Sequence, residues 1–507
     1  MIGMTTTVEP TTRAGRREWL GLAVLALPTI LIGLDMTVLH LAAPMLTADL
    51  GPSSSELLWI IDVYGFVVAG LLITMGTVGD RIGRRRLLMI GAAGFAVASL
   101  IAAFATSAAM LIGARALLGL AGATLMPSTL SLISNMFRDP RQRQLAIAIW
   151  MTNFMVGGIA GPLVGGVLLQ NFHWGSVFLI GIPPLLLLLV LARPLLPEFR
   201  NPGAGRIDLA SVALSTGAII AVVYALKETA KDGVHLISLV VLAAGLLAGY
   251  TFVRRQLTLT EPLLDLRLFH LPSFSVSLGA QTFGLFVLAA TGFLAVQYFQ
   301  LVLGLSPLEA GLWMMPSAVS GILGTLGGPV IVRRLSARTS MTLGFLIAVP
   351  GLALMALSGR TAIVVGLVIA NFGIQLVLAL TYDLVVGSAP PERAGVASGM
   401  GETGTELGMA LGVAVAGSLV TAVYRSQVTE QTLPAGVSSE ARDTLGSAVA
   451  VADHLPGPLA REVLELTRAA YTDGVQLAAL VSLGIVVVLA VATATLLRTR
   501  QRDTVES

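Results

Sequence analysis

The sequence GTVGDRIGRRRL, residues 76–87, joins two long apolar runs and decides how the whole chain is interpreted. It combines one acid with four arginines and three glycines. Glycines let helix ends approach closely, and a carboxylate can pair with nearby arginines or accept hydrogen bonds at a helix N-terminus. The alternative is a basic loop that only sets topology, which needs neither the acid nor the spaced glycines. We predict a cytoplasmic lock that times a conformational change and consists of Gly76, Asp80, Arg81, Gly83, Arg84 and Arg85.

Apolar runs long enough to cross a bilayer lie on both sides of this loop. A span of ~30 Å takes about 20 residues. The chain of 507 residues is 55% hydrophobic and 12% charged, with mean hydropathy +0.87, whereas soluble proteins carry roughly 25% charged residues. We therefore predict an all-α polytopic membrane protein with fourteen helices, near 19–40, 57–79, 87–107, 109–133, 144–169, 174–195, 207–227, 235–253, 273–302, 308–332, 339–359, 361–386, 396–424 and 474–497.

The basic residues indicate the orientation of these helices. With the N-terminus inside, Lys and Arg gather in the segments predicted to be cytoplasmic, as membrane proteins require. Of the 31 Lys and Arg, the short outer loops hold only Lys227, Lys231 and Arg360. A missed or invented helix would invert this pattern downstream, and no inversion occurs. This distribution predicts that both termini lie in the cytoplasm. The strong preference for Arg over Lys favours a bacterial source, and we therefore expect a bacterial inner-membrane protein.

Composition and missing motifs exclude several classes of function. A net charge of +3 argues against a nucleic-acid partner, and the absence of cysteine excludes disulfides and thiolate metal sites. Residues 399–404 fit a dinucleotide-binding pattern, but no strand precedes them, so close helix packing explains the glycines better. There is no phosphate-binding loop and no zinc-protease motif. We therefore expect neither an enzyme nor a cofactor, and ATP-driven transport by this chain lacks support.

Two further motifs follow the 76–87 loop in order. The helix near 109–133 carries Leu111, Arg115, Gly119 and Gly122. The next helix carries glycines that fall on one face, where a neighbouring helix can pack at backbone distance, and a proline that permits a bend. Together the three motifs resemble those of the major facilitator superfamily, the second its buried arginine motif and the third its antiporter motif. The predicted antiporter-motif residues are Gly157, Gly161, Pro162, Gly165 and Gly166.

Further segments narrow the resemblance to the fourteen-helix drug:proton antiporter branch, the group of the QacA, SmvA and LfrA exporters. These segments are 34–44, 59–64, 262–269 and 401–408. The sequence departs from that pattern at His40, where family members often have Asn, and near 328–338, where no Asp accompanies the arginines. The resemblance implies two six-helix bundles that rock between inward and outward states. We therefore predict an N-terminal bundle at 1–200, a two-helix insert at 201–270 and a C-terminal bundle at 271–507.

Acids predicted inside helices outnumber the buried bases. They are Asp35, Asp62, Asp383, Glu402 and Glu406, with Arg115 as the one base, and Asp383 is interpreted as a solvated helix end. A central charge costs roughly 2.5–3.5 kcal/mol in a bilayer, close to the ~4 kcal/mol needed to neutralise an Asp at pH 7. These groups therefore suit proton carriers, and the excess of acid favours cationic cargo over anionic cargo. The alternative for each acid is a structural ion pair.

Roles are assigned to these residues as follows. The resemblance places Asp35 in proton coupling, with Arg115 as its partner, and we add Glu406. Glu402 and Glu406 lie four residues apart on one helix face, and with Asp62 they are predicted to bind cargo. Aromatic and Met side chains suit flat apolar cations, although packing or lipid contact is an equal alternative. The cargo candidates are Trp150, Phe154, Tyr298 and Trp313, with Phe286, Phe293, Met151 and Met155.

The long outer segment 425–473 carries helix signals of its own. Ser438 and Ser439 before Glu440 predict a cap, and 458–471 predicts an amphipathic helix begun by Pro458. The segment is interpreted either as a lid over an outer vestibule or as a solvated insertion.

Three functions are compatible with the sequence. The first is a functional monomer in the lipid bilayer that exchanges protons for lipophilic cations such as dyes, quaternary ammonium compounds and biguanides. The second is a dedicated exporter of one endogenous metabolite on the same fold. The third is an uptake symporter or membrane-bound enzyme, against which the antiporter motif and the missing catalytic groups argue.

The predicted topology can be tested with single cysteines, because the chain has none of its own. In intact cells, Ser439→Cys should react with a membrane-impermeant thiol reagent, because 425–473 is predicted to lie outside. Ser507→Cys should be protected until the membrane is permeabilised. The reverse pattern of labelling would show that the orientation is wrong.

Overall fold

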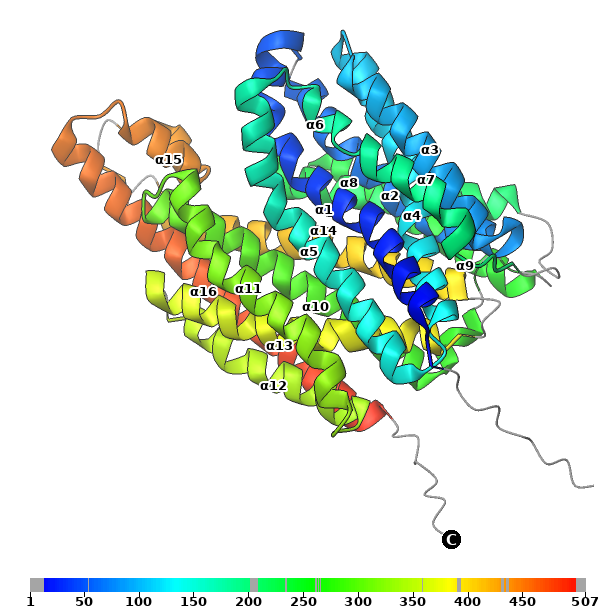
Figure 1. Ribbon diagram of the computed structural model, residues 1–507. Helices are drawn as coiled ribbons and strands as arrows, with labels where there is room; N and C mark the ends of the chain where they lie inside the picture. Colours follow the sequence, from blue (N-terminus) through cyan, green and yellow to red (C-terminus); the bar gives the residue numbers. More distant parts are fainter. Residues whose placement is uncertain are drawn as a thin grey trace, which may run out of the picture. The chain divides into compact units, whose positions relative to one another are not determined.

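Helices make up almost all of the structure, a computed structural model (Figure 1). It describes residues 13–497 except 53, 201–207, 233–234, 260–261, 263, 265, 358, 390–393, 430–432 and 435–436. Over these residues there is no strand, and fourteen helical spans are long and apolar enough to cross a membrane. The prediction of an all-α polytopic protein with fourteen spans is confirmed.

Contacts divide the chain into two compact units. The first comprises Met1–Tyr64, Met75–Ala204 and Ala389–Ser398, and the second comprises Gly65–Thr74, Gly205–Ser388 and Gly399–Ser507. The predicted division into two bundles and an insert stays a prediction. The helices that lie wholly or mainly in the first unit are α1 (Arg16–Leu50), α2 (Ser54–Ile82), α3 (Arg84–Ala103), α4 (Ala108–Met136), α5 (Pro140–Asn171), α6 (Ser176–Leu179) and α7 (Ile182–Leu195).

Helices α1 and α5 pack at backbone distance along a seam of glycines. A methyl group added at Gly157 would meet the carbonyl oxygen of Ile30, and one at Gly161 would meet Thr37. Gly33 faces the backbone of Phe154 in the same way, and the Thr37 hydroxyl donates to the carbonyl of Gly158 at 3.2 Å. The close approach predicted for the glycine face of α5 is therefore confirmed, and its partner is α1.

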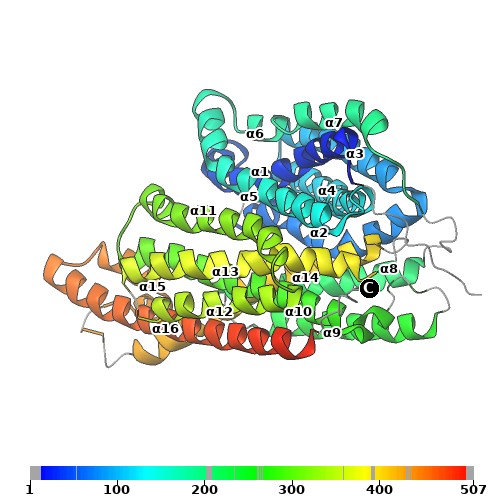
Figure 2. The same cartoon turned by 60° about the horizontal axis from the view of Figure 1, so that its bottom comes forward.

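Besides a segment of α2, the second unit contains the two helices predicted as an insert and the helices that follow them. The helical segments that lie wholly or mainly in it are α8 (Leu209–Asp232), α9 (Leu236–Thr258), η1 (Leu266–His270), α10 (Pro272–Gln297), η2 (Tyr298–Val302), α11 (Pro307–Val332), α12 (Ala337–Met355), α13 (Arg360–Gly387), α14 (Ala394–Gln427), η4 (Ser439–Arg442), α15 (Leu445–Ala452) and α16 (Gly457–Leu496). Figure 2 shows α11, α13, α12 and α16 running side by side, in agreement with their contacts. Glycines again set the distance, since Gly344 and Gly351 on α12 face the backbone of Gly373 and Gly366 on α13.

A polar cluster joins the start of α8 to the end of α9. Asp208 accepts hydrogen bonds from Ser211 at 2.7 Å and from Arg255 at 2.7 Å and 3.1 Å. The Arg255 hydrogen bonds, followed by that of Ser211, hold the pKa of the Asp208 carboxyl well below its usual range. Gln256 donates to Ser211 at 2.7 Å and closes the cluster.

A segment in the middle of α2 belongs to the second unit and packs against α8. Phe66 and Tyr224 meet edge to face, with ring centroids 6.0 Å apart. Gly70 lies against Ile220, and its carbonyl accepts a hydrogen bond from Thr216 at 3.0 Å. These contacts join α8 to the part of α2 between residues 65 and 74.

The segment after α14 differs from the prediction in one respect. Ser438 caps η4 as expected, because its hydroxyl accepts the N–H of Glu440. The amphipathic helix predicted at 458–471 is not separate, because α16 runs without a break for 40 residues from Gly457 to Leu496. Its sequence holds no internal proline that would end it between these two parts. Arg468 on this helix donates to the carbonyl of Leu301, in the π-helical η2, at 3.0 Å.

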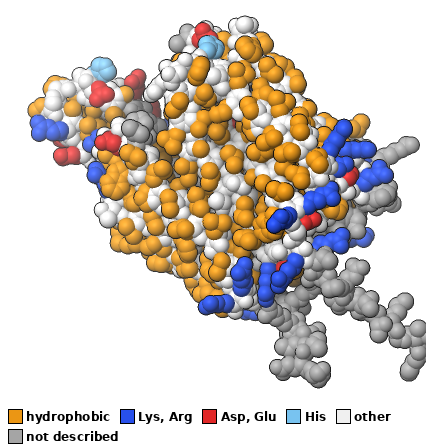
Figure 3. Space-filling model, viewed as in Figure 1, with side chains coloured by type: hydrophobic (Ala, Val, Ile, Leu, Met, Phe, Trp, Pro, Cys, Tyr) orange, Lys and Arg blue, Asp and Glu red, His pale blue; other side chains and the backbone are white. Residues whose placement is uncertain are grey.

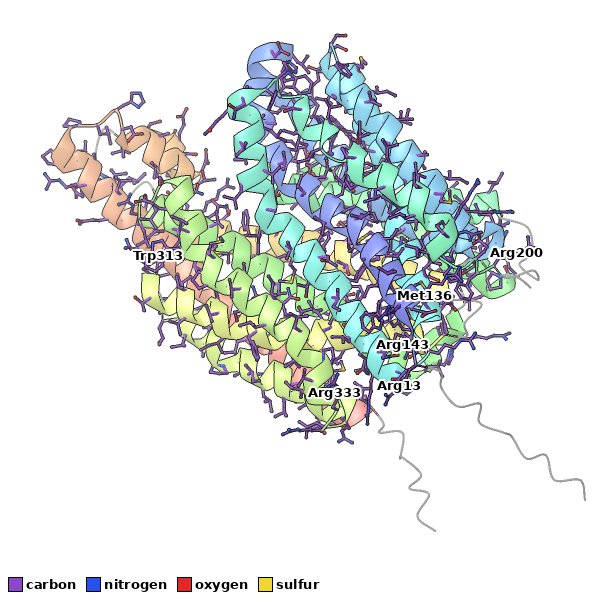
Figure 4. The ribbon with its side chains drawn as sticks, in the orientation of Figure 1. Arg13, Met136, Arg143, Arg200, Trp313 and Arg333 are labelled. Carbon is purple, nitrogen blue, oxygen red and sulfur yellow. The ribbon has the colours of Figure 1, made fainter. Side chains whose placement is uncertain are left out.

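Many of the basic side chains lie near the ends of helices. Figure 3 shows a face that is mostly hydrophobic, with Lys and Arg gathered along one of its edges. In the first unit, Arg13 and Arg143 lie near each other at one end (Figure 4), where the backbone N–H of Ala14 also donates to the side chain of Gln142. In the second unit, Arg333 follows the end of α11, and Trp313 lies in the second turn at the opposite end.

The glycine seam predicts a difference between two substitutions on α5. Gly157→Ala should lower the thermal unfolding midpoint, because the new methyl meets the α1 backbone and overpacking costs about 1–3 kcal/mol. Gly166→Ala is the matched control, since nothing lies within 4 Å of its added methyl. It should be neutral or slightly stabilising, as Ala favours helix over Gly. Equal midpoints for the two purified variants in detergent would contradict the seam.

Candidate functional site

Arg115 is the junction of three helices in the first unit. The side chain is 3% exposed, and its Nη1 lies 2.8 Å from Oδ2 of Asp35 on α1. Its Nε donates to the carbonyl of Ile60 on α2 at 3.2 Å. The pairing predicted for Asp35 and Arg115 is therefore present, and a change of charge at Asp35 would act directly on the contact between α4, α1 and α2.

Tyr64 completes this junction and received no role from the sequence. The Arg115 guanidinium lies 4.7 Å from the centroid of its ring, a cation–π distance. The ring meets Phe95 of α3 edge to face at 6.5 Å, and Gly122 leaves room for its hydroxyl end. Its position two residues after Asp62 was the one sequence feature that pointed to it. The ring contacts could not be predicted, because they depend on which helices become neighbours.

The 76–87 loop is a junction of one residue. Helix α2 ends at Ile82, α3 begins at Arg84, and Gly83 between them has φ +110°, a value that favours glycine. Asp80 pairs with Arg84, which is 1% exposed. Gly79 leaves the space that the Arg84 guanidinium fills. The loop therefore contains the predicted acid–arginine pair, buried inside the first unit, while its role as a lock stays a prediction.

The carboxylate at the N-terminus of α3 is that of Glu198, whereas the sequence analysis considered Asp80 for this position. Oε1 of Glu198 accepts the backbone N–H of Arg85 at 3.0 Å, and the backbone N–H of Arg84 donates to the carbonyl of Phe199 at 2.9 Å. Arg85 in turn donates to the carbonyl of Leu196 at 2.9 Å. A carboxylate at a helix N-terminus is electrostatically favourable. The sequence analysis missed Glu198 because it lies more than 100 residues from the loop.

The acids of α14 lie in a different setting, in the second unit. Glu402 is 3% exposed, and its Oε1 has no hydrogen-bond partner among the described residues. Glu406, one turn later, is half-buried and is the charged group that acts on Glu402. The two acids share a helix face as predicted, but only one of them is fully enclosed.

The remaining predicted acids differ in exposure. Asp62 on α2 is half-buried and lies two residues after Ile60, whose carbonyl Arg115 holds. Asp383 on α13 is 4% exposed, so its interpretation as a solvated helix end is wrong. The helix continues to Gly387 and its neighbours cover this turn, which the sequence pattern did not show.

The cargo candidates among the aromatic residues do not share one environment. Trp150 is buried, and its Nε1 donates to Thr129 of α4 at 3.1 Å, so it packs α5 onto α4. Phe154 is half-buried and Tyr298 is buried in η2. Trp313 is 39% exposed and lies 5.5 Å from the guanidinium of Arg360. Their contact with cargo stays a prediction.

Some predicted positions fall on parts that the structure leaves undescribed. The side chains of His40 and Pro162 lie outside the described residues, although α5 continues through position 162. Across the described part of the chain, no group of three His, Asp or Glu that could hold a metal ion is found.

The family model described as Major Facilitator Superfamily matches residues 25–413. Among solved structures, the fold is similar to that of the human organic anion transporter MFSD10. The TM-score is 0.61 and the identity 17%, over 92% of this chain and 99% of that one. At this identity the likeness concerns the fold alone, and it agrees with the helical architecture described above.

Two curated relatives cover nearly the whole chain. It is 44% identical to the multidrug efflux pump LfrA of Mycolicibacterium smegmatis, over 93% of this chain and 95% of the relative. It is 36% identical to the methyl viologen resistance protein SmvA of Salmonella typhimurium, over 90% and 93%. The resemblance drawn from the motifs is confirmed. The chain belongs to the Major Facilitator Superfamily and is a multi-pass membrane transporter, not an enzyme.

Proposed function

We propose that the chain is a proton-driven multidrug exporter of lipophilic mono- and divalent cations that works by alternating access. It acts as a monomer in a bacterial inner membrane, with both termini in the cytoplasm. Its relatives support drug export, since one is named a multidrug efflux pump and another for resistance to methyl viologen, a divalent organic cation.

The observation that carries this proposal is the unequal pairing of buried charge. Asp35 is matched by Arg115 at 2.8 Å, whereas Glu402 is buried with an oxygen that no described donor reaches. A buried carboxyl without a counter-charge is unfavourable unless a proton or another cation joins it. A site that alternates between proton and cationic cargo meets that requirement in both halves of an exchange cycle.

Asp35 and Arg115 supply the coupling step. A proton on Asp35 would remove the charge that holds Arg115, while the Nε bond of Arg115 to Ile60 on α2 remains. The contact between α1 and the other two helices is then weaker, and α1 carries the glycine seam with α5. Proton binding thereby biases the packing of the helices that the antiporter motif joins.

The experiment that tests the function is dye efflux from a pump-deficient host. Cells that express the chain should export ethidium, benzalkonium and a bisbiguanide, and dissipation of the proton gradient should stop this export. Export of no cation in the set would contradict the multidrug function and favour a dedicated exporter of one metabolite.

The proposed role of the 76–87 loop predicts that a substitution there changes the transport rate without changing substrate affinity. Asp80→Asn should impair transport severalfold and leave substrate affinity within about threefold, because a bias between states needs no cargo contact. Asp139→Asn is the control, since Asp139 caps α5 through the N–H groups of Arg141 and Gln142 and Asn caps equally well. Normal transport by Asp80→Asn would reduce the loop to a topology signal.

Division of labour among the acids is the second prediction of the proposal. Asp35→Asn should abolish export of every substrate. Asp62→Asn should weaken divalent export by about tenfold relative to monovalent export, because a dication gains from two separated carboxylates. Proton release induced by ethidium or a diamidine in energised inverted vesicles measures both, with the exposed Asp453→Asn as control.

Two outcomes would show that these roles are assigned wrongly. One is equal loss of mono- and divalent export in Asp62→Asn. The other is substrate-driven proton flux that persists in Asp35→Asn.

A further inference from the structure

The turn of α14 that carries Glu402 and Glu406 is held by hydrogen bonds from two neighbouring helices. These hydrogen bonds, from Gln281 and Tyr382, are together called the grip. Gln281 on α10 is fully buried, and its Nε2 donates to the carbonyl of Gly401 and to the hydroxyl of Thr405, both at 3.0 Å. The hydroxyl of Tyr382 on α13 lies 3.0 Å from the same Thr405 oxygen. Gly401 directly precedes Glu402 in the sequence, and Thr405 directly precedes Glu406.

The hydrogen-bond donors of this cluster already have acceptors within it. Gln281 uses its amide hydrogens on Gly401 and Thr405. Thr405 also reaches the Gly401 carbonyl, at 3.1 Å, and shares a hydrogen bond with Tyr382. Each of these groups is buried, so water does not replace a missing partner.

Two acceptors remain without a donor among the described residues. They are Oε1 of Gln281 and Oε1 of Glu402. An orphaned acceptor in an apolar interior is unfavourable, because it has lost its hydrogen bonds to water without replacement. A proton on the Glu402 carboxyl would remove a buried charge that no described donor meets at Oε1.

We propose that Gln281, Thr405 and Tyr382 are positioning residues that hold the Glu402 turn in place to take up a proton during export. This inference rests on the proposed proton-driven function. The hydrogen bonds fix the helix turn from two sides, so the backbone that carries Glu402 stays in place when its charge changes. The further charged group that acts electrostatically on Glu402 and on Tyr382 is Glu406, on the same helix as Glu402. Helix α10 contributes the uncharged Gln281, and α13 contributes Tyr382.

Thr403 offers a matched control for Thr405. Its hydroxyl is also buried on α14, but it bonds only the carbonyl of Gly399 on its own helix, at 2.8 Å. Valine has nearly the shape of threonine without the hydroxyl. Thr405→Val therefore removes the grip between helices, and Thr403→Val removes a bond within one helix.

The experiment measures ethidium export and proton movement together in proteoliposomes that hold the purified full-length chain. Thr405→Val and Gln281→Leu should lose coupling, seen as fewer protons moved per ethidium than in the parent chain, because Glu402 is no longer held where it takes up the proton. The KM for ethidium should stay within about threefold. Thr405→Ser should restore the ratio, and Thr403→Val should match the parent chain.

Each result decides the matter. If Thr405→Val lowers the export rate but keeps the parent ratio of protons to ethidium, the grip is only structural and the inference is wrong. The same holds if Thr403→Val changes the ratio equally. If the parent chain exports ethidium without any proton movement, the proton-driven function itself is wrong. In that case Thr405→Val has no ratio to alter.

Discussion

The hydrocarbon core of a bilayer offers no water to a polar group, and the other features of this structure follow from that constraint. Backbone groups are satisfied within helices, and many hydroxyls bond back to their own helix, as Thr29 does to Leu25 at 2.7 Å. Long polar side chains must find partners on other helices. Arg115 meets Asp35 and Ile60, and Gln281 meets Gly401 and Thr405. The polar contacts between helices thus gather at a few buried positions.

The same constraint explains the use of glycine. Without a hydrophobic drive between helices in lipid, association depends on close packing. Gly157 and Gly161 bring α5 to the backbone of α1, and Gly351 and Gly366 bring α12 to α13. A seam of this kind tolerates no added methyl group, yet it contains few directional bonds. Helices joined in this way hold a precise distance and can still slide or tilt.

The sequence predicts what depends on local composition and charge. Apolar length identified the fourteen spans, and the charge inventory identified Asp35 and Arg115 as partners. It could not identify Glu198, Gln281 or Tyr382, because their roles depend on which distant helices become neighbours. Gln281 in particular is uncharged, so a search for ionisable residues inside apolar helices does not find it. Asp383 was misjudged for the same reason, since burial near a helix end is decided by other helices. The break between α6 and α7 was also missed inside an apolar run.

The length of α16 has a mechanical consequence. Its 40 residues span about 60 Å at 1.5 Å per residue, twice the ~30 Å of the hydrocarbon core. By length alone, about half of the helix exceeds the thickness of the hydrocarbon core. A tilt of about 5° at the membrane would carry the far end by roughly 3 Å over a 30 Å arm. Because the helix is continuous, a displacement of the half beyond the bilayer would be transmitted to the half within it.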